Sequence, residues 1–572
     1  MAKNFALKLT LILTLAGAVR LISLGKIPDM FDGDEAFFGY YGFSLAGWAS
    51  DEYGKKLPVY FSSLGDYKYP VYAYASTVWV KLFGLNEAAT RTPSAVAGIV
   101  AVAALMVLTG YLTGNRRVVY VAGLLMAVSP WHVWMSRRAL EANLGLTMLL
   151  IAVTLGVAGV KYRKNNWLGL AVVFAGLAVY SYASARLMTA ILALAAGVWL
   201  VATKRFKAGI VLGGVVLMIA LGSFLQPESR ARGSGIMIWN KQSMEEIQKR
   251  LEEDIHADGI AVDRGPLVVT RIMHNKWLYL GKYFVEKMAA HFDASFLLVN
   301  GNERDRYRIS NMGLLSYAEA ILVITGLMVL ARKNLRLLIL AMGWWVASAV
   351  APALSTEPIQ AVRYAAAVVP VIFIGAWGLA AAARRKWLVY PALVVLALNF
   401  WYFWHQYSVV KTYLRPWYLE SELKHLSGLV AKHQPDYKSV ALSGDPYIYF
   451  LFYRKTPPPE FLAKADIDDG KYKWDRVNKY ENIIFKVSGN CPKLGKLGVL
   501  YMCQGPEVPI NSRVIELVRY NDGVPAYTLI DFVALSQAAK ADLPEGLHYM
   551  VETDLRFGDD ALIPDDYPGL TL

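Results

Sequence analysis

The chain has 572 residues, of which 56% are hydrophobic and only 18% are charged. Soluble globular chains carry about 25% charged residues, so an ordinary soluble protein is excluded. The dense apolar runs and the 13% aromatic residues exclude a disordered chain. Two cysteines are too few for a disulfide scaffold or a four-cysteine zinc site. The composition therefore predicts an integral membrane protein.

Eleven apolar segments are long enough, or nearly so, to cross a bilayer. A helix needs about 20 apolar residues to span a hydrocarbon core of about 30 Å. In chain order, the segments are 9–24, 95–112, 118–134, 142–160, 167–185, 187–203, 208–226, 314–331, 337–353, 364–383 and 387–404. We predict a polytopic α-helical membrane domain over residues 1–410, with about 11 transmembrane helices.

Basic clusters in alternate loops predict the orientation. They lie at 116–117, 161–164, 204–207, 332–336 and 384–386. Cytoplasmic loops of membrane proteins carry the excess of Lys and Arg, so the N-terminus is predicted inside and most of the net charge of +14 is explained by topology. Nucleic-acid binding is the poorer explanation. A cleaved signal peptide is the alternative for the first segment.

This orientation places three large segments outside the cytoplasm. They are the first outer loop (28–91), the large outer loop (227–312) and the C-terminal residues 411–572. We therefore predict a multi-pass protein of the cytoplasmic membrane whose larger soluble parts are extracytoplasmic. The loop at 227–312 is expected to be either a mobile lid or a docked structural insertion.

The C-terminal segment combines a helical pattern with short apolar runs. The helical pattern covers 421–434, and the runs are 439–442, 481–487, 499–503, 514–518 and 527–533. Their length and their β-branched and aromatic content favour strands, so we predict an extracytoplasmic α/β domain over 411–572. Prolines 457–459 predict a loop. Outside the cytoplasm a disulfide between Cys491 and Cys503 is expected, with two free buried thiols as the alternative.

Isolated charged residues gather at the predicted outer face. The first outer loop carries Asp34, Glu35, Asp66 and Lys68, and the outer ends of later helices carry Arg138, Glu141, Arg186, Glu357 and Arg363. Charges at such positions are costly and usually mark a substrate pathway or pair with one another. For any single arginine, the alternative is a side chain that reaches to the lipid headgroups.

These residue types suit a lipid substrate that carries a phosphate. Cations would bind the phosphate, while an apolar groove would hold the lipid tail. A carboxylate, either Asp34 or Glu35, would deprotonate an attacking hydroxyl. Lys68, Arg138, Arg186 or Arg363 would stabilise the charge that develops on the leaving phosphate. The pattern predicts group transfer from a lipid phosphate.

Several short motifs occur in a characteristic order along the chain. The pair Asp34-Glu35 follows the first helix, and is followed by Gly-x-x-Leu-Pro at 54–58, Lys-Tyr-Pro at 68–70 and Arg-Thr-Pro-Ser at 91–94. Two later blocks lie at 136–141 and 363–370. Together they resemble the GT-C membrane glycosyltransferases, specifically the group of protein O-mannosyltransferases and lipid A aminoarabinose transferases.

The resemblance implies a GT-C-like fold, a polyprenyl-phosphate-linked sugar donor, and transfer with inversion at the anomeric carbon. It implies that Asp34 is the catalytic acid of the first loop and that Lys68 lies near the donor phosphate. Glu141 and Asp66 would support the site or bind a divalent cation, the one cofactor left open. The Trp-Trp-Asp motif of oligosaccharyltransferases is absent, because Val346 follows the Trp pair at 344–345; transfer of a whole oligosaccharide to asparagine is disfavoured.

We therefore predict a hexosyl- or pentosyltransferase at the outer face of the membrane. Asp34 is the expected general base, supported by Glu35, and Lys68, Arg138, Arg186 and Arg363 are the expected phosphate ligands. The acceptor hydroxyl could belong to a protein, a lipid or a glycan. The alternatives are a transporter or flippase for lipid-linked sugars and a non-catalytic assembly subunit that binds them.

Overall fold

The computed structural model describes residues 2–63, 66–261, 272–302, 304–414, 420, 422–444, 446–468, 476–487, 490–533 and 543–550. The chain forms two compact units. Unit 1 comprises Met1–Ile22 and Pro93–Tyr407, and unit 2 comprises Ser23–Thr92 and Ser408–Leu572. The structure thus groups the first outer loop with the C-terminal segment, whose residues 551–572 lie outside the described residues.

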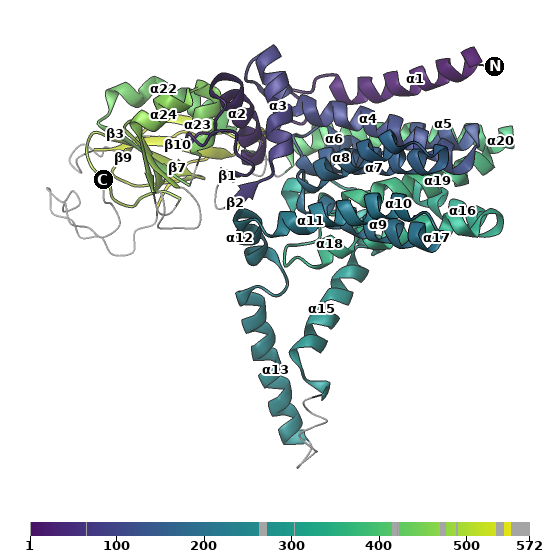
Figure 1. The fold of residues 1–572 in the computed structure, drawn as a ribbon. Coiled ribbons are helices and arrows are strands. Elements are labelled where there is room, and N and C mark those ends of the chain that lie inside the picture. The colour runs from purple at the N-terminus through teal and green to yellow at the C-terminus, as the bar shows by residue number, and fades with distance from the viewer. Residues whose placement is uncertain are drawn as a thin grey trace. The chain divides into compact units, whose positions relative to one another are not determined.

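Unit 1 is helical (Figure 1). Its helices include α1 (Ala2–Leu21), α4 (Glu87–Thr113, entering from unit 2), α5 (Arg116–Val128), α6 (Pro130–Ser136), α7 (Glu141–Tyr162), α8 (Asn165–Val179), α9 (Ala183–Ala202), α10 (Phe206–Gly209), η1 (Ile210–Val215), α11 (Val216–Phe224), α12 (Pro227–Ile236), α13 (Lys241–Ala261), α15 (Lys276–Ala290), η2 (Ser295–Val299), η3 (Asp305–Tyr307), α16 (Tyr317–Lys333), α17 (Leu335–Ser348), α18 (Val350–Ala353), η4 (Ala365–Ala367), α19 (Val368–Ala382) and α20 (Lys386–His405). The short helices η5 (Gln406–Val410) and α21 (Lys411–Tyr413) continue α20 into unit 2.

Seven helical stretches among the described residues are long and apolar enough to cross a membrane. They are Glu87–Thr113, Glu141–Tyr162, Ala183–Ala202, Phe206–Phe224, Leu335–Ala353, Ala365–Ala382 and Trp387–Tyr413. The pair α5–α6, bent by 58°, would be an eighth. The fold is therefore that of a polytopic α-helical protein, but the predicted number of about 11 spans is not confirmed. Helices α8 and α16 have only 15 and 17 residues, fewer than a straight span needs.

Small residues allow close packing in unit 1. Helices α16 and α19 cross with Gly326 against the backbone of Ile374 and Gly378 against the backbone of Leu322. A Cβ atom at either glycine would collide with the facing carbonyl group. Glycine at such crossings is typical of helices that associate in a membrane, because there dispersion contacts, rather than exclusion of water, hold helices together.

Unit 2 contains a mixed sheet and the helices that pack on it. Its elements are α2 (Gly33–Trp48), β1 (Phe61–Ser63), β2 (Asp66–Lys68), α3 (Pro70–Phe83), α22 (Glu422–His433), η7 (Gln434–Asp436), β3 (Ser439–Ser443), α23 (Tyr447–Arg454), α24 (Pro458–Lys464), β4 (Ala465–Asp468), β5 (Arg476–Tyr480), β6 (Ile483–Val487), β7 (Val499–Gln504), β8 (Glu507–Val508), β9 (Ser512–Arg519), β10 (Pro525–Phe532) and β11 (His548–Tyr549). The main sheet has the order β4-β5-β6-β3-β7-β10-β9. Its central strand β3 is parallel to both neighbours, and the other pairs are antiparallel.

The α/β character of the C-terminal segment agrees with the prediction. The five apolar runs lie in β3, β6, β7, β9 and β10, and the helical pattern lies in α22. The prediction of a loop at prolines 457–459 is wrong in part. Pro457 is the N-cap and Pro458 opens α24, because a proline in the first helical turn loses no hydrogen bond.

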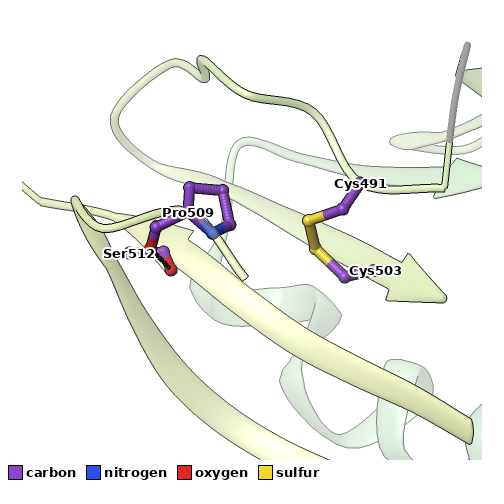
Figure 2. The surroundings of a disulfide bond; sticks show 4 residues. All are labelled: Cys491, Cys503, Pro509 and Ser512. Atoms are coloured by element: carbon purple, nitrogen blue, oxygen red, sulfur yellow. Dashed lines mark hydrogen bonds between the residues drawn. A yellow bond between two sulfur atoms is a disulfide. The ribbon is translucent and has the colours of Figure 1, made fainter. Parts of the chain in front are cut away.

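Cys491 and Cys503 form a disulfide in unit 2 (Figure 2). Cys503 is fully buried on β7, and its neighbours in the core include Val499, Tyr501 and Phe532. The bridge therefore attaches the segment before β7 to the centre of the sheet. A turn in which the Ser512 hydroxyl donates to the Pro509 carbonyl lies in the same region (Figure 2).

Candidate functional site

Asp34 lies in the first turn of α2, in unit 2. The helix begins at Asp32, whose carboxylate accepts a hydrogen bond of 3.0 Å from the Glu35 backbone N–H. This N-cap holds the first turn in place, because it satisfies one of the backbone donors that a helix leaves free at its start. The Asp34 side chain is 38% exposed, so the carboxylate is accessible to a substrate.

Lys68 brings two of the predicted acids together. Its Nζ atom lies 2.8 Å from Asp34 Oδ1 and 3.6 Å from Asp66 Oδ2. The short β1–β2 hairpin positions it, with Lys68 opposite Phe61, and its side chain is 8% exposed. Unit 2 thus contains a cluster of Asp34, Asp66 and Lys68 in which a nearly buried ammonium group contacts a more accessible carboxylate.

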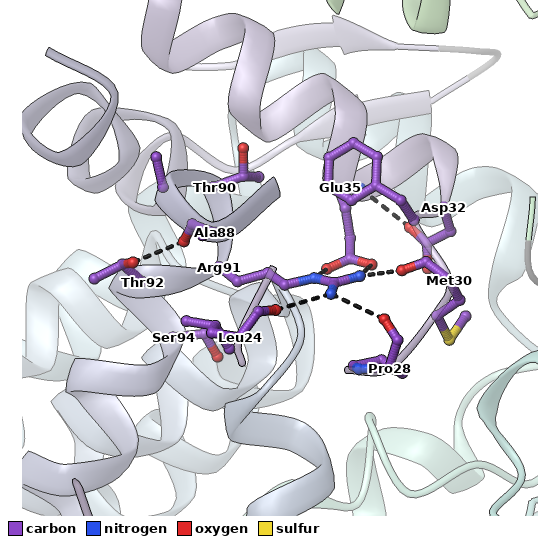
Figure 3. Close-up of polar contacts among 12 residues, drawn as sticks. Leu24, Pro28, Met30, Asp32, Glu35, Ala88, Thr90, Arg91, Thr92 and Ser94 are labelled. Atoms are coloured by element: carbon purple, nitrogen blue, oxygen red, sulfur yellow. Dashed lines mark hydrogen bonds and ion pairs between the residues drawn. The ribbon is translucent and has the colours of Figure 1, made fainter. Parts of the chain in front are cut away.

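Glu35 faces the interior and pairs with Arg91 (Figure 3). The guanidinium donates to both carboxylate oxygens, from Nε at 2.9 Å and from Nη2 at 3.1 Å. It also donates to the carbonyl oxygens of Leu24 and Pro28, each at 3.1 Å, and to that of Met30. Both side chains are fully buried. Arg91 therefore ties the segment that leads into α2 to the helix itself.

The C-terminal part of unit 2 also holds the start of α2. The Tyr449 hydroxyl, on α23, contacts the Phe31 carbonyl at 3.0 Å and the Glu420 carboxylate. The same carboxylate accepts a 3.0 Å hydrogen bond from the Gly33 backbone N–H. Farther along α2, the Tyr40 hydroxyl donates to the Thr456 carbonyl at 2.7 Å. Residues more than 380 positions away in sequence therefore fix the backbone on both sides of Asp34.

The predicted arginines lie in unit 1. The Arg138 guanidinium is buried and lies 5.4 Å from the ring centre of Tyr307 and 5.6 Å from that of Trp134. Arg186 is also buried, beside Ser229 of α12 and 4.8 Å from the Phe224 ring. Buried guanidinium groups over aromatic rings are stabilised by the negative face of the ring.

Two other predicted site residues of unit 1, Arg363 and Glu141, also make polar contacts. Arg363 donates to the Ser355 hydroxyl at 2.7 Å, and Glu141 lies 3.8 Å from Arg232. Arg363, Glu141, Arg232 and Tyr307 all interact electrostatically with Tyr182, which precedes α9. Tyr307 also contacts Arg138, and Arg186 contacts Ser229 of α12, the helix that carries Arg232. We call Arg138, Glu141, Arg186, Arg232 and Arg363 the arginine cluster.

Sequence reasoning did not find every member of these groups. Arg232 lies in a charged stretch of the large outer loop and has no motif around it. Arg91 belongs to a motif, but its position at a helix end predicts a side chain that reaches to the lipid headgroups, whereas the structure buries it against Glu35. Glu357, in contrast, pairs with Arg304 at 2.5 Å. Alternation of polar and apolar residues gives no signal for such contacts, because the partners come from distant parts of the chain.

The described residues contain no group of three or more His, Cys, Asp or Glu side chains that could hold a metal ion. Asp34 and Asp66 both lie beside the Lys68 ammonium. The positive charge in this cluster comes from the Lys68 side chain.

Residues 68–225 match the model of a family described as dolichyl-phosphate-mannose-protein mannosyltransferase. No curated protein matches the chain significantly. The match confirms the resemblance over a part of the chain that includes the motifs at 68–70, 91–94 and 136–141.

Solved structures of two kinds are similar to the chain. One is the oligosaccharyltransferase AglB from Archaeoglobus fulgidus in complex with an inhibitory peptide and a dolichol-phosphate, with a TM-score of 0.45 and 13% identity over 79% of this chain and 64% of that one. Another is ArnT from Cupriavidus metallidurans bound to undecaprenyl phosphate, with a TM-score of 0.46 and 12% identity over 93% of this chain and 99% of that one. The chain spans about two thirds or less of the length of the archaeal oligosaccharyltransferases, 63% of one that was solved with a tethered acceptor peptide.

Lys68, Arg138, Glu141 and Arg186 all fall in the matched segment. The part of the chain that carries them is similar to a family of mannosyltransferases.

Proposed function

We propose that the protein is a glycosyltransferase that moves a sugar from a polyprenyl-phosphate donor to an acceptor hydroxyl. The observation that carries the proposal is the exposed Asp34 carboxylate held 2.8 Å from the nearly buried Lys68 ammonium. The match of residues 68–225 to the mannosyltransferase family supports the choice of reaction.

In the proposed reaction, Asp34 removes the proton of the acceptor hydroxyl as its oxygen attacks the anomeric carbon. The bond between that carbon and the phosphate oxygen breaks, and polyprenyl phosphate leaves with the electron pair. A single displacement of this kind inverts the anomeric configuration. Lys68 would exchange one partner for another, because a donor phosphate competes with Asp34 for the ammonium group.

The arginine cluster is proposed to bind phosphate. Arg138, Arg186 and Arg363 present buried or half-buried guanidinium groups, which pair with phosphate oxygens in a planar, two-pronged manner. Arg232 joins them because it and Arg363 both interact electrostatically with Tyr182. Glu141, 3.8 Å from Arg232, would position that arginine.

Glu35 is proposed to support the base rather than to replace it. Its carboxylate is fully buried against Arg91, whereas Asp34 is accessible. A divalent cation bound by Glu141 or Asp66 remains a prediction, and its test is the dependence of transfer on added Mg²⁺ or Mn²⁺ after treatment with a chelator.

The basic clusters between the helices support an active site at the outer face of the cytoplasmic membrane. There the acceptor would be a hydroxyl of a protein, a lipid or a glycan. A flippase would move the lipid-linked sugar intact, and an assembly subunit would bind it intact, so neither would release free polyprenyl phosphate.

The decisive experiment compares Asp34→Asn with the wild type. The purified proteins are given a panel of radiolabelled polyprenyl-phosphate hexoses and pentoses together with a membrane extract as the source of acceptors. We expect the wild type to release polyprenyl phosphate and Asp34→Asn to do so about 10²–10⁴-fold more slowly, the usual contribution of a general base.

Asp29→Asn is the matched control, because Asp29 is in the same loop but contacts Asn521. It should keep the wild-type rate. A wild-type rate in Asp34→Asn would refute the base assignment. If the wild type bound the donor but never consumed it, the result would favour the flippase or the assembly subunit.

A further inference from the structure

Helices α13 and α15 form an arm of unit 1 that the proposed reaction does not use. They occupy the loop between the candidate span that ends at Phe224 and helix α16. The two helices contact each other where the Tyr279 hydroxyl donates to the Asp254 carboxylate and His274 lies 4.0 Å from the same group. We call the pair the α13–α15 arm.

One end of α15 is attached to the end of a candidate span. Lys287 Nζ donates to the Glu357 carbonyl at 3.2 Å, and α15 packs against α18, which closes the span Leu335–Ala353. From there, the arm leaves the bundle across the direction of the spans rather than along it (Figure 1). The arm therefore starts at the level where the spans end and runs along that level.

An apolar stripe follows the exposed side of α15. Trp277, Gly281, Val285 and Ala289 recur at every fourth position, so they share one face of the helix, and all four are exposed. Trp277 is 72% exposed and Val285 is 62% exposed. Leu278, beside the stripe, is 52% exposed. A helix in water does not normally leave such a face uncovered, and an exposed apolar stripe marks an interaction surface.

The polar residues of the arm are arranged for a membrane surface. Lys276, whose ammonium lies 5.5 Å from the Trp277 ring centre, and Lys282 flank the stripe. Lys282 also pairs with Glu286 at 4.0 Å. Helix α13 carries exposed ion pairs as well, Lys241 with Glu245 and Arg250 with Glu246. In the view of Figure 1, α15 lies on the side of the arm toward the spans and α13 on the far side.

We propose that α15 lies in the headgroup layer of the bilayer, with its apolar stripe toward the acyl chains and α13 covering it on the aqueous side. Tryptophan and lysine beside an apolar helix face are the residues that favour this interface, and the lysines would contact anionic lipid headgroups. Because α15 is attached at the end of a span, its apolar stripe would continue the lipid-facing surface of that span. The proposal does not rest on the glycosyl transfer.

Site-specific fluorescence in the full-length protein tests the proposal. Both cysteines of the chain are in the disulfide, so an introduced cysteine is the sole free thiol. Val285→Cys places an environment-sensitive label on the stripe, Leu278→Cys places it beside the stripe, and Glu253→Cys places it on the exposed side of α13. The labelled proteins are reconstituted in phosphatidylcholine vesicles that contain lipids with a nitroxide near the glycerol backbone.

We expect the nitroxide lipids to quench the labels at positions 285 and 278 at least twofold more than the label at 253, and aqueous iodide to show the opposite order. Adding phosphatidylglycerol should increase the difference, because Lys276 and Lys282 are cationic. Equal quenching at all three positions would overturn the proposal. Protection from both quenchers that grows with the protein-to-lipid ratio would also overturn it, and would assign the stripe to a second copy of the chain.

Discussion

Asp34 and Glu35 are adjacent in the sequence, yet the fold gives them different surroundings. Consecutive residues of a helix point about 100° apart, so α2 turns Asp34 toward solvent and Glu35 into the interior of unit 2. The motif alone predicts that one of the two acids acts as a base. Only the fold shows which acid is accessible, because Glu35 is fully buried against Arg91 while the Asp34 side chain is 38% exposed.

The pairing of Glu35 with Arg91 predicts a strong energetic coupling. Removing one member of a buried ion pair costs about 3–5 kcal/mol, because the remaining charge stays out of water without its counter-charge. We expect Arg91→Gln alone to lower the free energy of unfolding by roughly this amount. In a double-mutant cycle with Glu35→Gln, the coupling should exceed about 1 kcal/mol. Urea unfolding of the purified protein, followed by tryptophan fluorescence, measures it, and additive losses would contradict the pairing.

At the scale of elements, apolar length located the seven candidate spans, but the predicted number of about 11 is not confirmed. The run at 118–134 was expected to be one helix, but it bends by 58° between α5 and α6. The reason is Pro130, which opens α6, so that Ser129 adopts an extended backbone. Strands β4 and β5 were not predicted, because polar residues dominate both and neither has a continuous apolar run.

The N-cap of α2 predicts an effect on both stability and turnover. Asp32→Ala removes the acceptor of the Glu35 N–H, which should cost about 0.5–2 kcal/mol and loosen the first turn that carries Asp34. We therefore expect slower sugar transfer with little change in KM for the donor. Asp32→Asn can still cap the helix and serves as the control. If sugar transfer slowed equally in Asp32→Ala and Asp32→Asn, the loss would come from the charge of Asp32 and not from the helix cap.

At the scale of the whole chain, the division into units was beyond the sequence. The apolar pattern separates residues 1–410 from the C-terminal segment, but the structure groups residues 23–92 with that segment. The contacts responsible include Tyr449 with Phe31 and Tyr40 with Thr456, pairs separated by more than 400 residues. Local propensity and periodicity contain no information on such pairs.

These long-range contacts predict that the C-terminal part of unit 2 maintains the geometry of Asp34. Tyr449→Phe removes the hydroxyl that contacts the Phe31 carbonyl and the Glu420 carboxylate, just before and beside the start of α2. A hydrogen bond contributes about 0.5–1.5 kcal/mol net, so the protein should stay folded while kcat for sugar transfer falls and KM for the donor is retained. Tyr501→Phe is the matched control, because its hydroxyl accepts a hydrogen bond from the Lys496 backbone N–H within the C-terminal segment. It should lower stability to a similar extent without changing kcat. Equal kcat values in the two variants, at equal loss of stability, would show that the C-terminal segment merely adds stability and does not position the base.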